Sequence, residues 1–149
     1  MQATVPRTPA PELPRRISLA DSAKSGIELN HTPAHVAFAQ RWAYHAARSG
    51  DRTNSAVATA AVVLVENAHA HTRSGLPGGG VRLVLTRGPF LLALEVTDDG
   101  PRPGQARYPL PRTRPDRTGL RLVEHLTIYW DWEGTGGGPL TVRAMFELP

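Results

Sequence analysis

The sequence contains no cysteine, which excludes disulfide bonds and metal sites built from thiolates. It also lacks any apolar run close to the roughly 18 residues that a membrane-spanning helix needs. Its N-terminal segment has no apolar stretch of the kind found in secretory signals. These absences disfavour membrane insertion and secretion, and they indicate a cytoplasmic protein.

Lysine is almost absent as well: Lys24 is the single Lys among 17 basic residues, and the formal net charge is +4. Nucleic-acid binding would need basic residues clustered on one face and interleaved with aromatic residues. The Arg residues are instead scattered from Arg7 to Arg143, so the sequence disfavours direct nucleic-acid binding. The densest group lies in one segment and consists of Arg102, Arg107, Arg112, Arg114 and Arg117.

Motifs of hydrolases and metal sites are missing too. No Gly-x-Ser-x-Gly elbow and no Gly-x-x-x-x-Gly-Lys-Ser/Thr phosphate loop occurs. A Thr-Pro break separates His31 from His35, and His69 and His71 point about 200° apart around a helix. The pattern therefore disfavours a zinc site. We interpret these His as surface or pocket-edge residues.

The length of 149 residues and the apolar content of 40% are sufficient for one domain with a buried core. Residues 1–25 are rich in Pro and show no sustained periodicity. This predicts a flexible tail, with a short ordered piece near residues 16–19. Residues 26–149 form the predicted domain.

The pattern in that domain predicts three helices. Thr32 and Pro33 provide a cap and a first-turn Pro for a helix that runs to about Arg48. A second, Ala- and Val-rich helix follows at residues 51–72, and a short third one at 119–126. Strands are predicted at 26–31, 81–86, 90–97, 127–132 and 140–148, and a long loop at 101–117. Strands segregated from helices predict an α+β fold, a two-layer sandwich with the helices on one face of a mostly antiparallel mixed sheet.

The second helix carries an unusual polar end. Ala60, Val63, Leu64, Asn67 and His71 recur at helical spacing and share one face. Later segments supply an acidic turn, Asp98-Asp99-Gly100, and a Gly-Leu step at the start of the third helix, Gly119-Leu120. A polar helix end, an acidic turn and a loop that ends at a Gly are the parts of a nucleotide pocket.

In this order and spacing, the segments resemble the GHKL (Bergerat) ATP-binding domain of histidine kinases, gyrase-type topoisomerases and MutL proteins. They resemble in particular the actinobacterial anti-sigma factor/serine kinase family, the SpoIIAB/RsbW-like proteins. The resemblance implies that Asn67 holds Mg²⁺ against the triphosphate and that Asp98 accepts a hydrogen bond from the adenine amino group. It implies ATP and Mg²⁺ as cofactors and a cofactor-binding set of Asn67, His71, Asp98, Gly100, Arg117, Gly119, Leu120 and Thr141.

The chain departs from the family pattern at its catalytic position. Val63 stands four residues before Asn67, where the family has a Glu that polarises the attacking nucleophile. Val cannot accept a proton. Glu66 is a substitute candidate, but it points about 100° away from Asn67 around the helix. Arg117 and Arg102 also replace Gly of the family pattern, and such Arg could bind phosphate or an acidic protein surface.

Three hypotheses follow for function. The first is an ATP-binding-fold regulator that binds a sigma factor, an anti-sigma antagonist or another transcription regulator, with weak or lost kinase activity. The second is an active serine-protein kinase that uses Glu66 or a substrate-assisted route. The third is a scaffold that binds no nucleotide. The resemblance also makes the first strand and helix a candidate surface for a homodimer.

Overall fold

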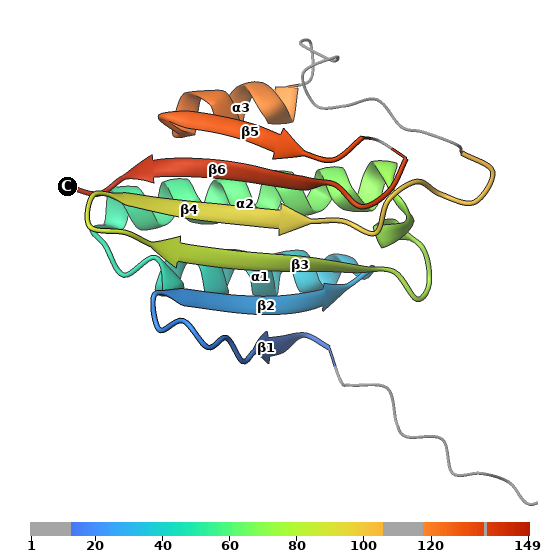
Figure 1. Cartoon of the computed structure of the whole chain (residues 1–149), viewed down its shortest axis with the longest axis horizontal. Helices are drawn as coiled ribbons and strands as arrows, with labels where there is room; N and C mark the ends of the chain where they lie inside the picture. Colours follow the sequence, from blue (N-terminus) through green and yellow to red (C-terminus); the bar gives the residue numbers. More distant parts are fainter. Residues whose placement is uncertain (1–12, 106–117, 136) are drawn as a thin grey trace, which may run out of the picture.

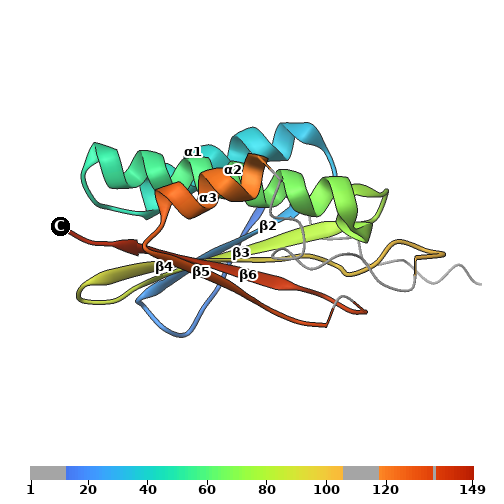
Figure 2. The ribbon, with the colours of Figure 1, turned by 90° about the horizontal axis from the view of Figure 1, so that it is seen from above.

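The computed structural model describes residues 13–105, 118–135 and 137–149. These residues form one six-stranded sheet with the strand order β1-β2-β3-β4-β6-β5 (Figure 1). All three helices lie on one face of the sheet (Figure 2). The predicted two-layer α+β sandwich is therefore confirmed. Every strand pairing in the described part of the chain is antiparallel.

The strands form where apolar and polar residues alternate. The buried positions of β3 are Val81, Leu83 and Leu85, and each has a more exposed residue on either side. β4 lies between β3 and β6 and is therefore an inner strand of the sheet. The strands are β1 (Arg15–Ile17), β2 (Lys24–Asn30), β3 (Gly80–Arg87), β4 (Leu91–Thr97), β5 (Tyr129–Glu133) and β6 (Thr141–Glu147).

Two long helices cover the middle of the sheet. α1 (Pro33–Ala46) starts at the predicted Pro, and α2 (Asp51–His71) is followed by the short helix η1 (Arg73–Gly75). Ala39, Ala43 and Ala47 recur every four residues, share one face of the helix and are fully buried. Arg87 of β3 donates hydrogen bonds to the carbonyl oxygens of Ala47 and Arg48, and so it ties the end of α1 to the sheet.

The core lies between these helices and the sheet. Its α2 side is a stripe of buried residues that includes Val57, Ala61, Leu64 and Ala68. Val63, Asn67 and His71 border this stripe and are half-buried. Of the five residues predicted to share one face of α2, Ala60 and Leu64 are therefore in the core, and the other three lie on a partly exposed flank.

The third helix, α3 (Thr118–Leu126), packs beside α2 and next to β5 (Figure 1). Leu120 and Val123 turn into the core and are at most 5% exposed. None of the helices in the described ranges is both long and apolar enough to cross a membrane.

Candidate functional site

The predicted site residues come from three segments: the C-terminal end of α2, the turn after β4 and the first turn of α3. The end of α2 and the turn after β4 lie at the same end of the sheet, and the first turn of α3 lies farther back along α2, where Gly119 approaches Val63 (Figure 1). Arg117 lies outside the described residues. The other seven cofactor-binding candidates all belong to these segments or to the first residue of β6.

Asp98 is the structural centre of the acidic turn. It is only 8% exposed. Its Oδ1 accepts a hydrogen bond from the backbone N–H of Gly100 at 2.8 Å and another from that of Leu140 at 3.1 Å. The backbone N–H of Asp98 donates in turn to the carbonyl of Leu140 at 3.0 Å. One carboxylate therefore joins the turn after β4 to the residue that precedes β6.

The side chains of Thr97 and Thr141 lie directly beside this turn. The two residues are paired across β4 and β6, and their Oγ1 atoms are 2.8 Å apart. The Thr141 hydroxyl is hydrogen bonded to Thr97, on the sheet face opposite that of the core residues Val96 and Val142. A contact of Thr141 with nucleotide stays a prediction.

Gly100 is required by the backbone of the turn. Its φ is +88°, a conformation that side chains disfavour, and a Cβ atom would lie 2.9 Å from the carbonyl carbon of Gly138. Gly104 has a similar φ of +81° but open space around the Cβ position. An Ala at position 100 would have both backbone strain and a steric clash, whereas an Ala at position 104 would have the strain alone. Comparing the two substitutions therefore isolates the cost of the clash.

We expect Gly100→Ala to lower the free energy of unfolding by about 2–4 kcal/mol, because left-handed strain and overpacking add. Gly104→Ala should cost about 1–2 kcal/mol, because it incurs the strain alone. Urea unfolding followed by circular dichroism measures both values. Equal losses for the two variants would show that the contact with Gly138 carries no energy.

A second set of hydrogen bonds fastens η1 to the same turn. The backbone N–H of Asp99 donates to Ser74 Oγ at 2.9 Å, and Gly80 N–H donates to Asp99 Oδ2 at 2.7 Å. The backbone N–H of Arg73 donates to the carbonyl of Gly100 at 2.9 Å. Ser74 is fully buried. The sequence contained no motif for these contacts, because each depends on a tertiary approach of distant segments.

Arg102 has a role that the sequence did not predict. Its guanidinium donates to the carbonyl oxygens of Thr72 at 3.0 Å and His69 at 2.9 Å. These carbonyls lie at the C-terminal end of α2, where backbone acceptors are left without helical partners and a cation is favoured. Arg102 thus makes the contacts of a helix C-cap. This role explains why an Arg stands at position 102 without phosphate binding or docking of an acidic surface.

Val63 faces the first turn of α3. A Cβ atom placed on Gly119 would lie 3.1 Å from Val63 Cγ1, so the two residues are in close contact. Asn67 follows one turn later on α2 and is half-buried. The position where the family has its catalytic carboxylate is therefore an apolar contact against the Gly of the candidate phosphate loop.

Glu66 lies elsewhere. It is exposed and lines a shallow groove between α1 and α2, together with Pro33, Val36 and His69. Gly119 and the Asp98 turn do not line this groove. The Glu66 side chain is thus on the α1 side of the helix, away from Val63.

His71 is half-buried at the last turn of α2. It lines a separate hollow of 410 Å³ with Ala70 and the loop residues Arg102, Pro103, Gly104 and Gln105. This places His71 beside the start of the long loop, as expected for a residue at the edge of the candidate site.

Two other His residues hold α1 and α2 against β2. The backbone N–H of Asn30 donates to His35 Nδ1 at 2.9 Å, and His69 Nε2 lies 3.0 Å from the carbonyl of Asn30. Burial and then the nearby His31 lower the pKa of His35, and burial is also the main cause that lowers the pKa of His69. The interpretation of His35 as a surface or pocket-edge residue is wrong, because it is 8% exposed and hydrogen bonded.

The residues present fit a nucleotide better than they fit a metal ion alone. The buried Asp98 carboxylate is a suitable acceptor for an amino group, and α3 offers backbone N–H groups at its first turn. Asn67 contributes a single amide oxygen. Within the described ranges, no three His, Asp or Glu side chains converge on one point. Mg²⁺ would therefore need nucleotide phosphates and water as its other ligands.

No protein-family model matches this chain, and no curated protein matches it. The likeness to the GHKL domain consequently remains a proposal, supported by the order of the segments along the chain and by the acidic turn lying beside the end of α2.

Proposed function

We propose that this chain is a regulatory protein of the cytoplasm with an ATP-binding fold, which acts by binding a sigma factor, an anti-sigma antagonist or another transcription regulator. Phosphoryl transfer is weak or lost. Two features support this proposal: the acidic turn lies beside the end of α2, and the position where the resemblance implies a catalytic carboxylate is the apolar Val63 beside Gly119.

The contact between Val63 and Gly119 is the observation on which the proposal depends. Gly119 Cα is approached closely by a methyl group, and that methyl group cannot accept a proton. Loss of a general base typically lowers a rate by about 10²–10⁴ and leaves ground-state binding alone. A nucleotide bound here would consequently serve to stabilise one conformation more than to supply a phosphoryl group.

Asp98, Asn67 and the first turn of α3 would hold that nucleotide. Asp98 would accept a hydrogen bond from the adenine amino group. The N–H groups of Gly119 and Leu120 would face the phosphates, and Asn67 would contact the Mg²⁺ ion that accompanies them. When bound, Mg-ATP would supply the phosphate charge that the backbone N–H groups recognise and the cation that Asn67 contacts.

The kinase alternative has less support. It needs a base near the phosphates, and Glu66 lines the groove between α1 and α2 instead. The scaffold alternative needs the site to reject nucleotide. The hydrogen bonds around Asp98 are consistent with both a bound and an unbound state, so a binding measurement separates this alternative from the proposal.

Isothermal titration of the full chain with Mg-ATP tests the proposal. We expect micromolar binding to the wild type and a loss of about 10- to 100-fold in Asp98→Asn, because a hydrogen bond to a charged group is worth about 1.5–3 kcal/mol. The Asn retains an oxygen acceptor for the N–H groups of Gly100 and Leu140. Asp99→Asn serves as the control and should bind as the wild type does. Absence of binding to the wild type would favour the scaffold.

A further inference from the structure

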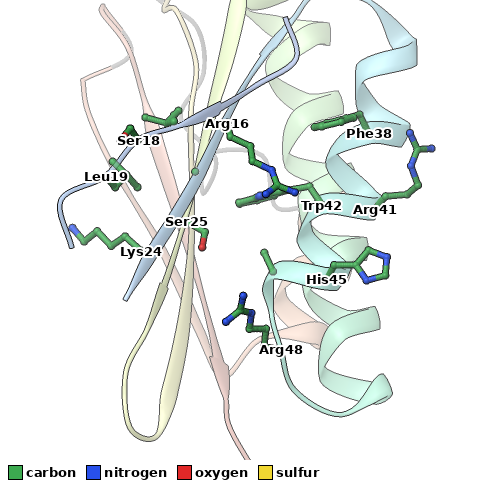
Figure 3. Close-up of a pocket in the computed structure, with 13 residues that line it drawn as sticks. Arg16, Ser18, Leu19, Lys24, Ser25, Phe38, Arg41, Trp42, His45 and Arg48 are labelled. Atoms are coloured by element: carbon green, nitrogen blue, oxygen red, sulfur yellow. The ribbon is translucent and has the colours of Figure 1, made fainter. Parts of the chain in front are cut away.

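A second hollow lies between the segment that contains β1 and helix α1 (Figure 3). Its volume is 770 Å³, which is within the usual range of about 300–1,000 Å³ for ligand pockets. β1 is one edge of the sheet, and the candidate nucleotide site includes α3, which packs next to the opposite edge strand, β5. We call this hollow the β1–α1 groove. Its lining includes Arg16, Ile17, Leu19, Phe38, Trp42 and Arg48.

The β1–α1 groove is strongly basic. Arg16, Lys24, Arg41 and Arg48 line it together with His45, and no Asp or Glu does. Within the described part of the chain the one ion pair is Arg15 to Glu28, so none of the four cations is neutralised there. Like charges gathered on one surface favour an anionic partner.

Two of the cations are aimed into the groove. Figure 3 shows Arg16 reaching from the β1 segment toward α1, and Arg48 reaching from the end of α1 toward the sheet. Arg41 and His45 point outward from α1, and Lys24 points away on the other side of the strands (Figure 3). The groove therefore has two inner guanidinium groups, with Arg41 at its outer edge.

The groove also has an aromatic floor. Phe38 and Trp42 are half-buried on α1 and pack against the core, which fixes their positions. Ile17 and Leu19 also line the hollow, but they lie beside Gly26 on the face of the strands that points away from α1 (Figure 3). Trp and Arg are the residues most often found at the energetic centre of protein interfaces. An apolar floor beneath guanidinium groups matches a ligand that has an apolar anchor between carboxylates.

We propose that the β1–α1 groove binds an acidic segment of a partner protein. An apolar side chain of that segment packs on Trp42, and carboxylates beside it pair with Arg16 and Arg48. Bidentate pairs of this kind are favoured by the planar guanidinium group. This inference deepens the proposed function, because it assigns a surface to the protein partner, and it rests on that function for the partner's regulatory role.

A peptide fits better than a nucleic acid for two reasons. Single-stranded nucleic acids are bound by a basic track with aromatic faces spread along it. Here both aromatic rings lie on one helix and are half covered by the core, so no row of aromatic faces follows the basic residues. These features accommodate a side chain more readily than a row of stacked bases.

The test selects binders from a random 12-residue peptide display library on the immobilised full chain. We expect enriched peptides with at least two carboxylates flanking an aromatic or aliphatic residue. The strongest one, made synthetically with a fluorescent label, should show micromolar affinity by anisotropy. Arg16→Glu and Arg48→Glu should each weaken it at least 10-fold. Arg52→Glu, an exposed residue in the first turn of α2, makes the same charge change elsewhere and should alter affinity less than 2-fold.

Several results would overturn the inference. They are enriched peptides without acidic residues, unchanged affinity in both groove variants, or displacement of the peptide by a 12-nucleotide single-stranded DNA at lower concentrations than by unlabelled peptide. A change from dimer to monomer in Arg16→Glu, seen by sedimentation equilibrium, would instead identify the groove as an interface between two copies. Mg-ATP titration of the wild type and of Arg16→Glu keeps the two proposals apart. Intact nucleotide binding together with an unchanged peptide affinity in the groove variants contradicts only this inference, whereas absence of Mg-ATP binding to the wild type contradicts only the nucleotide site of the proposed function.

Discussion

Replacing Asp98 by Ala is expected to lower the free energy of unfolding by about 3–5 kcal/mol. The substitution leaves the backbone N–H groups of Gly100 and Leu140 without the acceptor that both now share. Each buried donor without a partner costs about 1–3 kcal/mol, and bonds to a charged acceptor are at the stronger end. Urea unfolding monitored by intrinsic Trp fluorescence measures the loss, and the slope of the transition reports whether unfolding stays two-state.

The neighbouring Asp99 provides the matched control. Its Oδ2 accepts one hydrogen bond, from Gly80 N–H, at an exposed position. Asp99→Ala should therefore cost about 1 kcal/mol. Asp98→Asn should lie near the wild type in stability while it loses nucleotide affinity. If Asp98→Ala were no less stable than Asp99→Ala, the carboxylate would not hold the turn to β6.

The second large effect concerns position 63. We expect Val63→Glu to raise Mg-ATP turnover by about 10²-fold over the wild type, because a positioned general base contributes about 10²–10⁴ to a rate. The new carboxylate would extend from the flank of α2 toward the first turn of α3, one helical turn before Asn67. Release of inorganic phosphate at saturating Mg-ATP measures the effect, with nucleotide affinity determined separately.

Val63→Gln tests whether a gain in turnover comes from a group that accepts a proton or from the larger side chain. Gln has nearly the same shape as Glu but cannot act as a base, so its turnover should stay at the wild-type level. Equal gains in both variants would indicate that removing the methyl group from Gly119 matters and that the carboxylate does not. A wild type that already turns over Mg-ATP as fast as Val63→Glu would contradict the proposal of weak catalysis.

The sequence predicted the elements well because each has a local cause. Pro33 and the Ala spacing defined α1, and alternation defined β3. Strand segregation then predicted the two layers. The three-residue β1 was expected only as an ordered piece near residues 16–19, because its pairing with β2 is a tertiary contact that leaves no periodic pattern.

The site was predicted in part. The acidic turn and the Gly-Leu step were visible as motifs. The structure places the acidic turn beside the end of α2 and the Gly-Leu step beside Val63, and nucleotide binding by them stays a prediction. The helix cap by Arg102 was not visible, since it joins residues 30 and 33 positions apart. The burial of His35 was missed because its partner, the backbone of Asn30, lies beyond a Pro that ended the pattern. The β1–α1 groove was missed because Arg16 and Arg48 come close only through the fold.

The sheet order has a consequence for how the chain folds. β2 and β3 are neighbours, with Asn30 opposite Gly80, although the whole α1–α2 pair lies between them in the sequence. β4 and β6 are likewise separated by α3 and β5. Only the β3–β4 and β5–β6 hairpins, with β1–β2, close over short loops. Because entropy is lost before long-range pairings are formed, the hairpins and the two helices can form early, and the closure of β2 onto β3 sets the rate at which the sheet is completed.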